Sequence, residues 1–222
     1  MDNKISTNLD TGLLKVIAFL TMLIDHVGYM FFPNEAIWRI IGRISFPLFA
    51  YCLVIGFLKT KNLRKYFLRL GIFAAVSQAP YVFCFYPDAP TLHLNIGFTL
   101  LLGLWALYAL RRKNFFQFAA AVLLSLFPAV EYGIYGVLLI AAMGFFIDRK
   151  RSFFGICIGI YLASPFFGVF SDIAPAVQGF AAFAVVPLVI KTNSKIKIPR
   201  WLNYGFYPAH LCVLAILGHL IK

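Results

Sequence analysis

The chain has 222 residues, of which 62% are hydrophobic and 13% are charged, with a net charge of +12. A soluble domain has about 45–50% apolar and about 25% charged residues, so these apolar side chains cannot all be buried in a core surrounded by water. The composition therefore excludes an ordinary soluble domain and indicates a protein whose surface faces lipid.

A helix needs about 20 apolar residues to cross the hydrocarbon core of a bilayer, and the chain holds about nine runs that approach this length. These runs predict an all-α fold, a polytopic transmembrane helix bundle. The spans are placed at 13–31, 37–58, 66–85, 96–110, 115–128, 132–147, 153–170, 176–190 and 204–221, and the fifth is short for a full crossing. Because the loops are too short to hold a second domain, residues 1–222 are expected to form a single membrane-embedded domain.

Basic residues alternate between the loops. They gather before the first span and after the second, fourth, sixth and eighth, whereas the other side holds only Arg39, Arg43 and Lys222. Loops rich in Lys and Arg stay in the cytosol, so the N-terminus is predicted to be cytosolic and the C-terminus external. The positive charge is thus explained by topology, and we expect no nucleic acid partner. Four isolated cysteines without a CxxC motif predict no metal site.

Ionisable side chains inside a membrane are costly, by about 2.5–3.5 kcal/mol or more on insertion scales, which makes them candidates for function. Asp25 and His26 lie in the first span, but neighbours on a helix diverge by about 100°. One is therefore expected to meet the substrate and the other a partner helix. Arg39 and Arg43 share one helix face, and an ion pair with Asp25 would neutralise both partners. Alternatively, Asp25 serves helix packing and Arg39 reaches the outer interface.

Other polar candidates lie toward the outer half of the membrane. Tyr207 and His210 repeat at helical spacing in the last span, and Asn95, Glu131 and Tyr132 lie near the outer ends of other spans. Helix–helix hydrogen bonding is the alternative role for His210. Together these groups could bind ions, carry protons or perform acid–base chemistry, for which histidine is well suited. Composition alone does not choose among these functions.

Several segments resemble the TraX family of conjugative pilin acetylases and their relatives. The resemblance is most specific in LKVIAFLTMLIDHVG at 14–28 and RIIGRISFPLFA at 39–50. It continues in LRLGIFAAVSQAP at 68–80, NIGFTL at 95–100, EYGIYGV at 131–137 and YPAHL at 207–211. The region around 153–170 carries little of it.

The resemblance implies an acetyltransferase of the bacterial cytoplasmic (inner) membrane. It would move an acetyl group from cytosolic acetyl-CoA to an acceptor amine, such as the N-terminus of a pilin in conjugation, at or beyond the outer half of the membrane. By this resemblance His26 would be the catalytic residue. In the mechanism we expect, His26 takes the proton from the acceptor amine, Asp25 orients Arg43 or a histidine, and His210 is a second base or a substrate contact. Arg43 or Asn95 would stabilise the oxyanion.

The other site residues follow from the same reading. The acceptor is expected to contact Arg39, Asn95, Glu131, Tyr132 and Tyr207, and acetyl-CoA would be held by basic inner loops at Arg111, Arg112, Lys197 and Arg200. The acceptor could also be another peptide or a saccharide, and transfer could be direct or pass through an acetyl-histidine. A proton-coupled small-molecule transporter that uses the same buried groups is the alternative, and a membrane scaffold is a third reading.

Overall fold

The structure, a computed structural model, describes residues 7–88, 92–163 and 176–221. The last part of the seventh predicted span, 164–170, lies outside the described residues. Within them the fold is all-α, as expected. The elements are α1 (Thr11–Phe31), α2 (Ala36–Gly42), α3 (Ser45–Lys59), α4 (Leu63–Phe85), α5 (Ile96–Arg111), α6 (Phe115–Ser125), α7 (Gly133–Phe146), α8 (Lys150–Ala163), α9 (Ala176–Gly179), the 3-10 segment η3 (Phe180–Ala184), α10 (Val185–Val189) and α11 (Arg200–Ile221).

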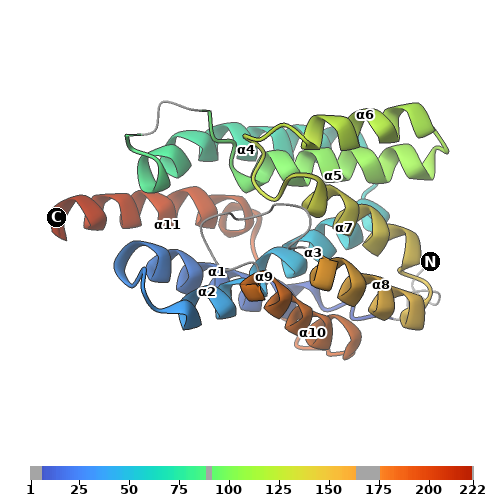
Figure 1. The fold of residues 1–222 in the computed structure, drawn as a ribbon. Coiled ribbons are helices and arrows are strands. Elements are labelled where there is room, and N and C mark those ends of the chain that lie inside the picture. Colours follow the sequence, from blue (N-terminus) through green and yellow to red (C-terminus); the bar gives the residue numbers. More distant parts are fainter. Residues whose placement is uncertain (1–6, 89–91, 164–175, 222) are drawn as a thin grey trace.

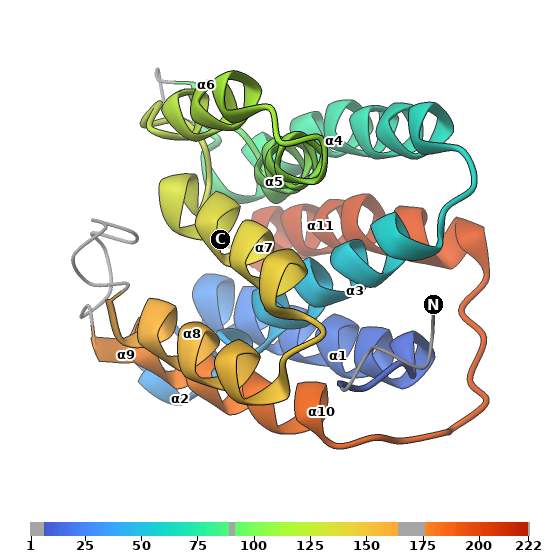
Figure 2. The same ribbon diagram turned by 90° about the vertical axis from the view of Figure 1, so that its right-hand side faces the viewer.

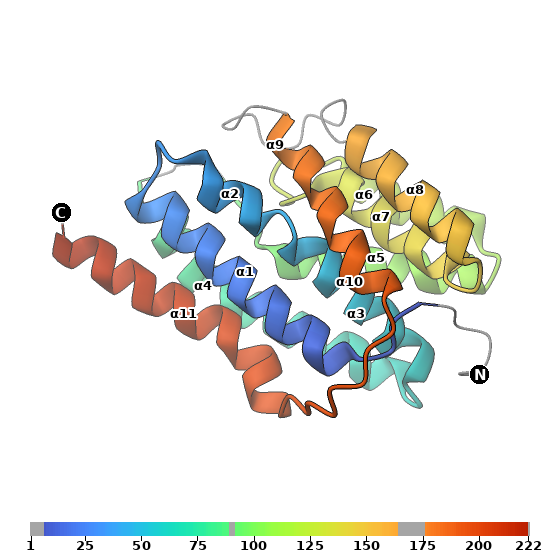
Figure 3. The ribbon, with the colours of Figure 1, turned by 90° about the horizontal axis from the view of Figure 1, so that it is seen from below.

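The helices form a layered bundle. Viewed along the bundle, α4, α5 and α6 lie on one side, α1, α2, α8, α9 and α10 on the other, and α3, α7 and α11 between them (Figure 2). Helix α1 begins at one end of the bundle and α11 finishes at the opposite end (Figure 1). Seen from below, α1 lies between α2 and α11 (Figure 3). The helix α1 therefore contacts elements from both ends of the sequence.

Among the described residues, four helical segments are long and apolar enough to cross a membrane: Thr11–Phe31, Ala36–Lys59, Leu63–Phe85 and Arg200–Ile221. Shorter apolar helices cover Ile96–Arg111, Phe115–Ser125, Gly133–Phe146 and Val177–Val189. The apolar helices agree with a membrane protein. The number of spans and the direction of insertion remain predictions.

Two of the predicted spans are interrupted. The second divides into α2 and α3, which are separated by a turn at Arg43 and Ile44, and the eighth is a series of short helices from α9 to α10. Hydrophobicity does not reveal such breaks, because both halves of the run are apolar. The break in the second span matters because Arg43 lies in it.

Side-chain caps fix where several helices begin. Asp10, Asn62, Asn95 and Asn114 precede α1, α4, α5 and α6, and each side-chain oxygen accepts a hydrogen bond from a backbone N–H of the first turn. These N–H groups have no partner within their own helix, so an Asx cap stabilises the helix start. The caps position the helices whose faces build the site described next.

Candidate functional site

Asp25 forms a buried ion-pair cluster with both predicted arginines. Nη1 of Arg39 donates to Oδ2 of Asp25 at 2.7 Å, and Nη2 of Arg43 donates to Oδ1 at 3.0 Å and Oδ2 at 3.2 Å. Arg43, only 2% exposed, also donates from Nη1 to Oε1 of Gln178 at 3.2 Å. Asp25 therefore engages both arginines at once.

Two glycines, Gly28 and Gly42, permit this cluster to form. A Cβ atom at Gly42 would lie 2.0 Å from Oδ1 of Asp25, and one at Gly28 would lie 2.0 Å from Cβ of Trp38. Real atoms do not approach so closely, so α2 can lie against α1 only with glycine at both positions. The close approach brings the carboxylate of Asp25 to the arginines at the end of α2.

His26 pairs with His210, although the two residues are 184 positions apart. Nδ1 of His26 lies 2.7 Å from Nε2 of His210, and the two rings are nearly parallel, at 10°. Nδ1 of His210 lies 2.8 Å from the carbonyl oxygen of Phe206. Adjacent residues on α1 thus face different partners, as their angular offset predicts: Asp25 faces the arginines and His26 faces α11.

The hydrogen bonds fix the tautomers of the neutral pair. A carbonyl oxygen can only accept, so Nδ1 of His210 carries hydrogen and donates to Phe206. Nε2 of His210 then has the lone pair and accepts from Nδ1–H of His26. The remaining ring nitrogen of His26, Nε2, is left without hydrogen. His26 consequently presents a basic nitrogen, and His210 orients it.

Aromatic rings hold this pair in place. The ring centroid of Phe85 lies 5.0 Å from that of His26 in an edge contact, and Phe206 packs against His210 at 5.0 Å. Tyr207 contacts both imidazoles, at 6.2 Å from His26 and 5.6 Å from His210. The rings can move little without disturbing these contacts, so the basic nitrogen of His26 has a defined direction.

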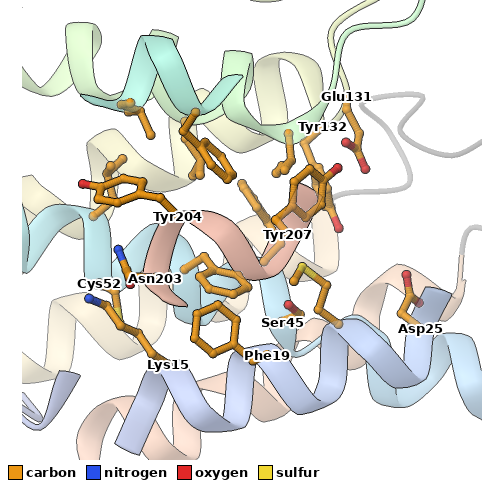
Figure 4. Close-up of a pocket in the computed structure, with 18 of the residues that line it drawn as sticks. Lys15, Phe19, Asp25, Ser45, Cys52, Glu131, Tyr132, Asn203, Tyr204 and Tyr207 are labelled. Carbon is orange, nitrogen blue, oxygen red and sulfur yellow. The ribbon is translucent and has the colours of Figure 1, made fainter. Parts of the chain in front are cut away.

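A cavity of about 440 Å³ runs between α1, α3, α4 and α11 and is lined by His26, Asp25, Arg39 and Arg43. Lys15 and Asn203 lie at one end, and Glu131, Tyr132 and Asp25 lie at the other (Figure 4). The cavity joins the end of the molecule where α1 begins to the cluster around His26. These ionisable side chains of the membrane helices thus meet in one cavity, as expected if function explains their cost.

Glu131 and Tyr132 form the wall of the cavity opposite Asp25. Tyr132 has a left-handed backbone, with φ at 62°, and its ring stacks on Phe46 at 4.0 Å. The hydroxyl of Thr99 donates to the carbonyl of Glu131, which helps to hold this strained turn. Oε2 of Glu131 is buried without a hydrogen-bond partner among the described residues, and the same holds for Nε of Arg39. Both residues line the cavity.

The structure places some predicted site residues elsewhere. Asn95 is fully buried, and its amide donates to the carbonyl of Ala74 and to Gln78, while its oxygen caps α5 at Gly97. It does not line the cavity, and its polar atoms are used, so its geometry fits a structural role better than the expected contact with an oxyanion.

The basic residues predicted to hold acetyl-CoA also lie away from the cavity. Arg111, Arg112, Lys197 and Arg200 are exposed and are absent from its lining, and the guanidinium of Arg111 lies over the ring of Phe57 at 5.5 Å. Lys15, Lys59 and Arg69 line the cavity instead. The sequence interpretation attributed these three to topology. For Lys15 the sequence did contain a signal of its place in the cavity. Lys15 lies at helical spacing from Phe19, Met22 and His26, so all four share one face of α1.

The chain is similar to a known protein family and to several known proteins. The TraX family, described as "TraX protein", matches residues 10–218. Protein TraX of Escherichia coli is 24% identical, with 93% of this chain and 85% of that protein covered. The probable fimbrial assembly protein FimC, serogroup H1, of Dichelobacter nodosus is 28% identical, with 63% of each chain covered. An uncharacterized protein of Rickettsia prowazekii (strain Madrid E) is also 28% identical, with 65% of this chain and 58% of that protein covered.

The matched stretches thus cover less than two thirds of the length of the Dichelobacter and Rickettsia proteins. No solved structure matches the chain. The family match extends over nearly the whole sequence and includes every residue that forms the His26–His210 pair and the Asp25 cluster. This protein belongs to the TraX family.

Proposed function

We propose that this protein is a membrane-embedded acetyltransferase that moves an acetyl group from cytosolic acetyl-CoA to an acceptor amine, the N-terminus of a pilin or another peptide, at or beyond the outer half of the membrane. The observation that carries the proposal is the cavity that connects the basic end of the bundle with His26. The name of the Dichelobacter relative, a probable fimbrial assembly protein, supports a pilin-like acceptor.

In this reaction His26 acts as the general base. Its Nε2, left without hydrogen by the bond to His210, takes a proton from the acceptor amine as the amine nitrogen attacks the thioester carbonyl carbon. The tetrahedral intermediate collapses, the carbon–sulfur bond breaks, and the proton passes to the CoA thiolate. The products are the acetylated amine and CoA with a free thiol. An acetyl-histidine intermediate would use the same nitrogen.

The arginines line the same cavity as His26 and are suited to stabilise the negative charge that would develop on the thioester oxygen. Arg43 is held by Asp25 and Gln178, so its position is fixed before the substrate arrives. Arg39 lines the cavity and retains an Nε–H without a partner among the described side chains. Loss of one preorganised donor to an oxyanion lowers kcat by about 10²–10³-fold, which is the effect expected for Arg39→Met.

In this proposal the acceptor enters at the end formed by Glu131 and Tyr132 and reaches Tyr207. The free carboxylate oxygen of Glu131 suits an amine, and the left-handed turn at Tyr132 aims both residues at the cavity. Glu131 and Tyr132 lie at the end of the cavity opposite Lys15, and Tyr207 lies between the two ends (Figure 4). Donor and acceptor would therefore approach His26 from opposite ends.

The test is release of thiol from acetyl-CoA by the protein purified in detergent, together with the mass of a co-expressed pilin. His26→Ala should abolish both the thiol release and the mass gain of one acetyl group on the pilin. His219→Ala, near the exposed end of α11, should change neither. Equal thiol release by wild type and His26→Ala would remove His26 from the mechanism. Substrate uptake into vesicles without any acyl-CoA turnover would support the transporter.

A further inference from the structure

A cationic group lies at the end of the cavity farthest from Glu131. It comprises Lys15 of α1, Lys59 at the end of α3 and Arg69 of α4, all of which line the cavity. The acids that line the cavity, Asp25 and Glu131, lie at its other end (Figure 4). Both ion pairs found in the described part of the chain use Asp25, so these cations have no carboxylate partner there.

Topology alone does not explain this arrangement. The positive-inside rule requires cations near the cytosolic ends of helices, but it does not require them to face a cavity. Arg111, Arg112, Lys197 and Arg200 satisfy the same rule from exposed positions outside the lining. Lys15 is different, because it lies within the apolar helix α1 and is partly buried. Cations that converge on one end of a cavity, with the acids of the lining at the other end, are suited to an anionic ligand.

We propose that Lys15, Lys59 and Arg69 bind the phosphate groups of the acyl-CoA donor at the cytosolic end of the cavity, an inference that rests on the proposed acetyltransferase function. The guanidinium of Arg69 lies over the ring of Tyr66, 5.8 Å from its centroid, which limits its freedom. A guanidinium held in this way can donate to two phosphate oxygens at once, and the two ammonium groups add charge.

The distance from this group to His26 fits the donor. Lys15 and His26 are eleven residues apart on α1, and a rise of 1.5 Å per residue separates them by about 16 Å along the helix. In CoA about thirteen bonds link the nearest phosphorus to the sulfur, and an extended chain gains about 3.5 Å for every three bonds, so the arm spans about 15 Å. Phosphates at Lys15 would therefore place the thioester beside His26.

The walls between the two ends suit the pantetheine arm. Phe19 and Phe49, whose ring centroids lie 5.4 Å apart, provide apolar surface together with Phe73. Asn203 and Tyr204 of α11 line the cavity near Lys15 and offer hydrogen-bonding groups to the amides of the arm (Figure 4). A narrow, mostly apolar passage with a few polar contacts matches a ligand that alternates methylene and amide groups.

The experiment measures binding of CoA to the full chain in detergent by calorimetry. Lys15→Gln, Lys59→Gln and Arg69→Gln should each weaken CoA binding by about tenfold, the lower range of a charge-assisted hydrogen bond. The matched controls are Lys61→Gln and Arg64→Gln, which remove charge from the same side of the bundle but do not line the cavity. They should leave the Kd for CoA within twofold of wild type. Arg69→Lys should recover part of the loss, because it keeps the charge.

A donor without phosphates separates this role from a structural one. Acetyl-pantetheine should be turned over with the same KM by wild type and by the three cavity variants. A rise in KM for acetyl-pantetheine equal to the rise for acetyl-CoA would overturn the phosphate site. A CoA affinity that is unchanged in all three variants, or lowered equally in Arg64→Gln, would also overturn it. Wild-type protein that binds CoA through these cations but transfers no acetyl group would refute the acetyltransferase and leave the site in place.

Discussion

Removal of the carboxylate of Asp25 tests whether the ion-pair cluster holds the helices together. Asp25→Ala would leave Arg39 and Arg43 side by side without a counter-charge, and Arg43 is only 2% exposed. Breaking a buried ion pair by removing one partner typically costs about 3–5 kcal/mol, because the remaining charge cannot be solvated. Here one carboxylate serves two guanidinium groups, so we expect a loss toward the upper part of this range.

The assay is unfolding in mixed micelles at increasing SDS fractions, followed by far-ultraviolet circular dichroism. Asp88→Ala is the control, since Asp88 is exposed in a turn and its removal should change the free energy of unfolding by less than about 0.5 kcal/mol. The double variant Asp25→Ala/Arg43→Met carries the sharper test. It also removes the most buried cation and should be at least about 1 kcal/mol more stable than Asp25→Ala alone.

This recovery is expected because the remaining cation, Arg39, is better placed to stand alone. Its side chain is 15% exposed, and its guanidinium lies 5.2 Å from the ring centroid of Tyr29. The reasoning fails if Asp25→Ala unfolds at the same SDS fraction as Asp88→Ala. It also fails if the effects of Asp25→Ala and Arg43→Met simply add, because additivity would mean that the two side chains do not interact.

Three further predictions follow from the packing and the hydrogen bonds. Gly42→Ala should destabilise the protein by about 1–3 kcal/mol in the same unfolding assay, because its Cβ would overlap Asp25, whereas Gly71→Ala, with nothing within 4 Å, should be neutral or stabilising. Nitrogen-15 NMR of wild-type protein at neutral pH should show the His26 ring with hydrogen on Nδ1 and none on Nε2; the reverse tautomer would contradict the assignment of the base. The backbone N–H of Ser194 lowers the pKa of Asp10 below 3.8, so the stability it contributes is present above that pH and lost as the pH falls through the folded-state pKa. Asp10→Asn should remove this part of the acid dependence of unfolding, and an unchanged pH profile would refute it.

The sequence was sufficient to predict the helices but not their interruptions. Long apolar runs identify α1, α4 and α11 because each lacks a break, and Asp25 with Arg39 and Arg43 could be paired because a short turn returns the chain to the same depth. The break between α2 and α3 was missed because the run around it is apolar, although Gly42 precedes it and Pro47, which has no N–H to donate to the carbonyl of Arg43, follows it. Local composition therefore predicted the elements and one local ion pair.

Long-range pairing was beyond the reach of the sequence. Both His26 and His210 were chosen as candidates because each is a polar residue in an apolar helix, yet nothing in either segment specifies that α1 and α11 are neighbours. The surroundings of Asn95 were hidden for a related reason. A buried amide serves a cap as readily as a substrate, and its hydrogen bonds with Gln78 and Ala74 join residues that no local pattern connects.

The adjacency of Asp25 and His26 explains how a single helix can serve both stability and chemistry. The offset of about 100° between neighbours sends the carboxylate toward α2, where two guanidinium groups balance it, and the imidazole toward α11. If the two side chains met, the carboxylate would accept the hydrogen on His26 and favour a charged ring. Their separation leaves the imidazole against a neutral partner and keeps a basic nitrogen available. The cluster around Asp25 therefore supplies positive charge to the cavity without removing the lone pair of His26.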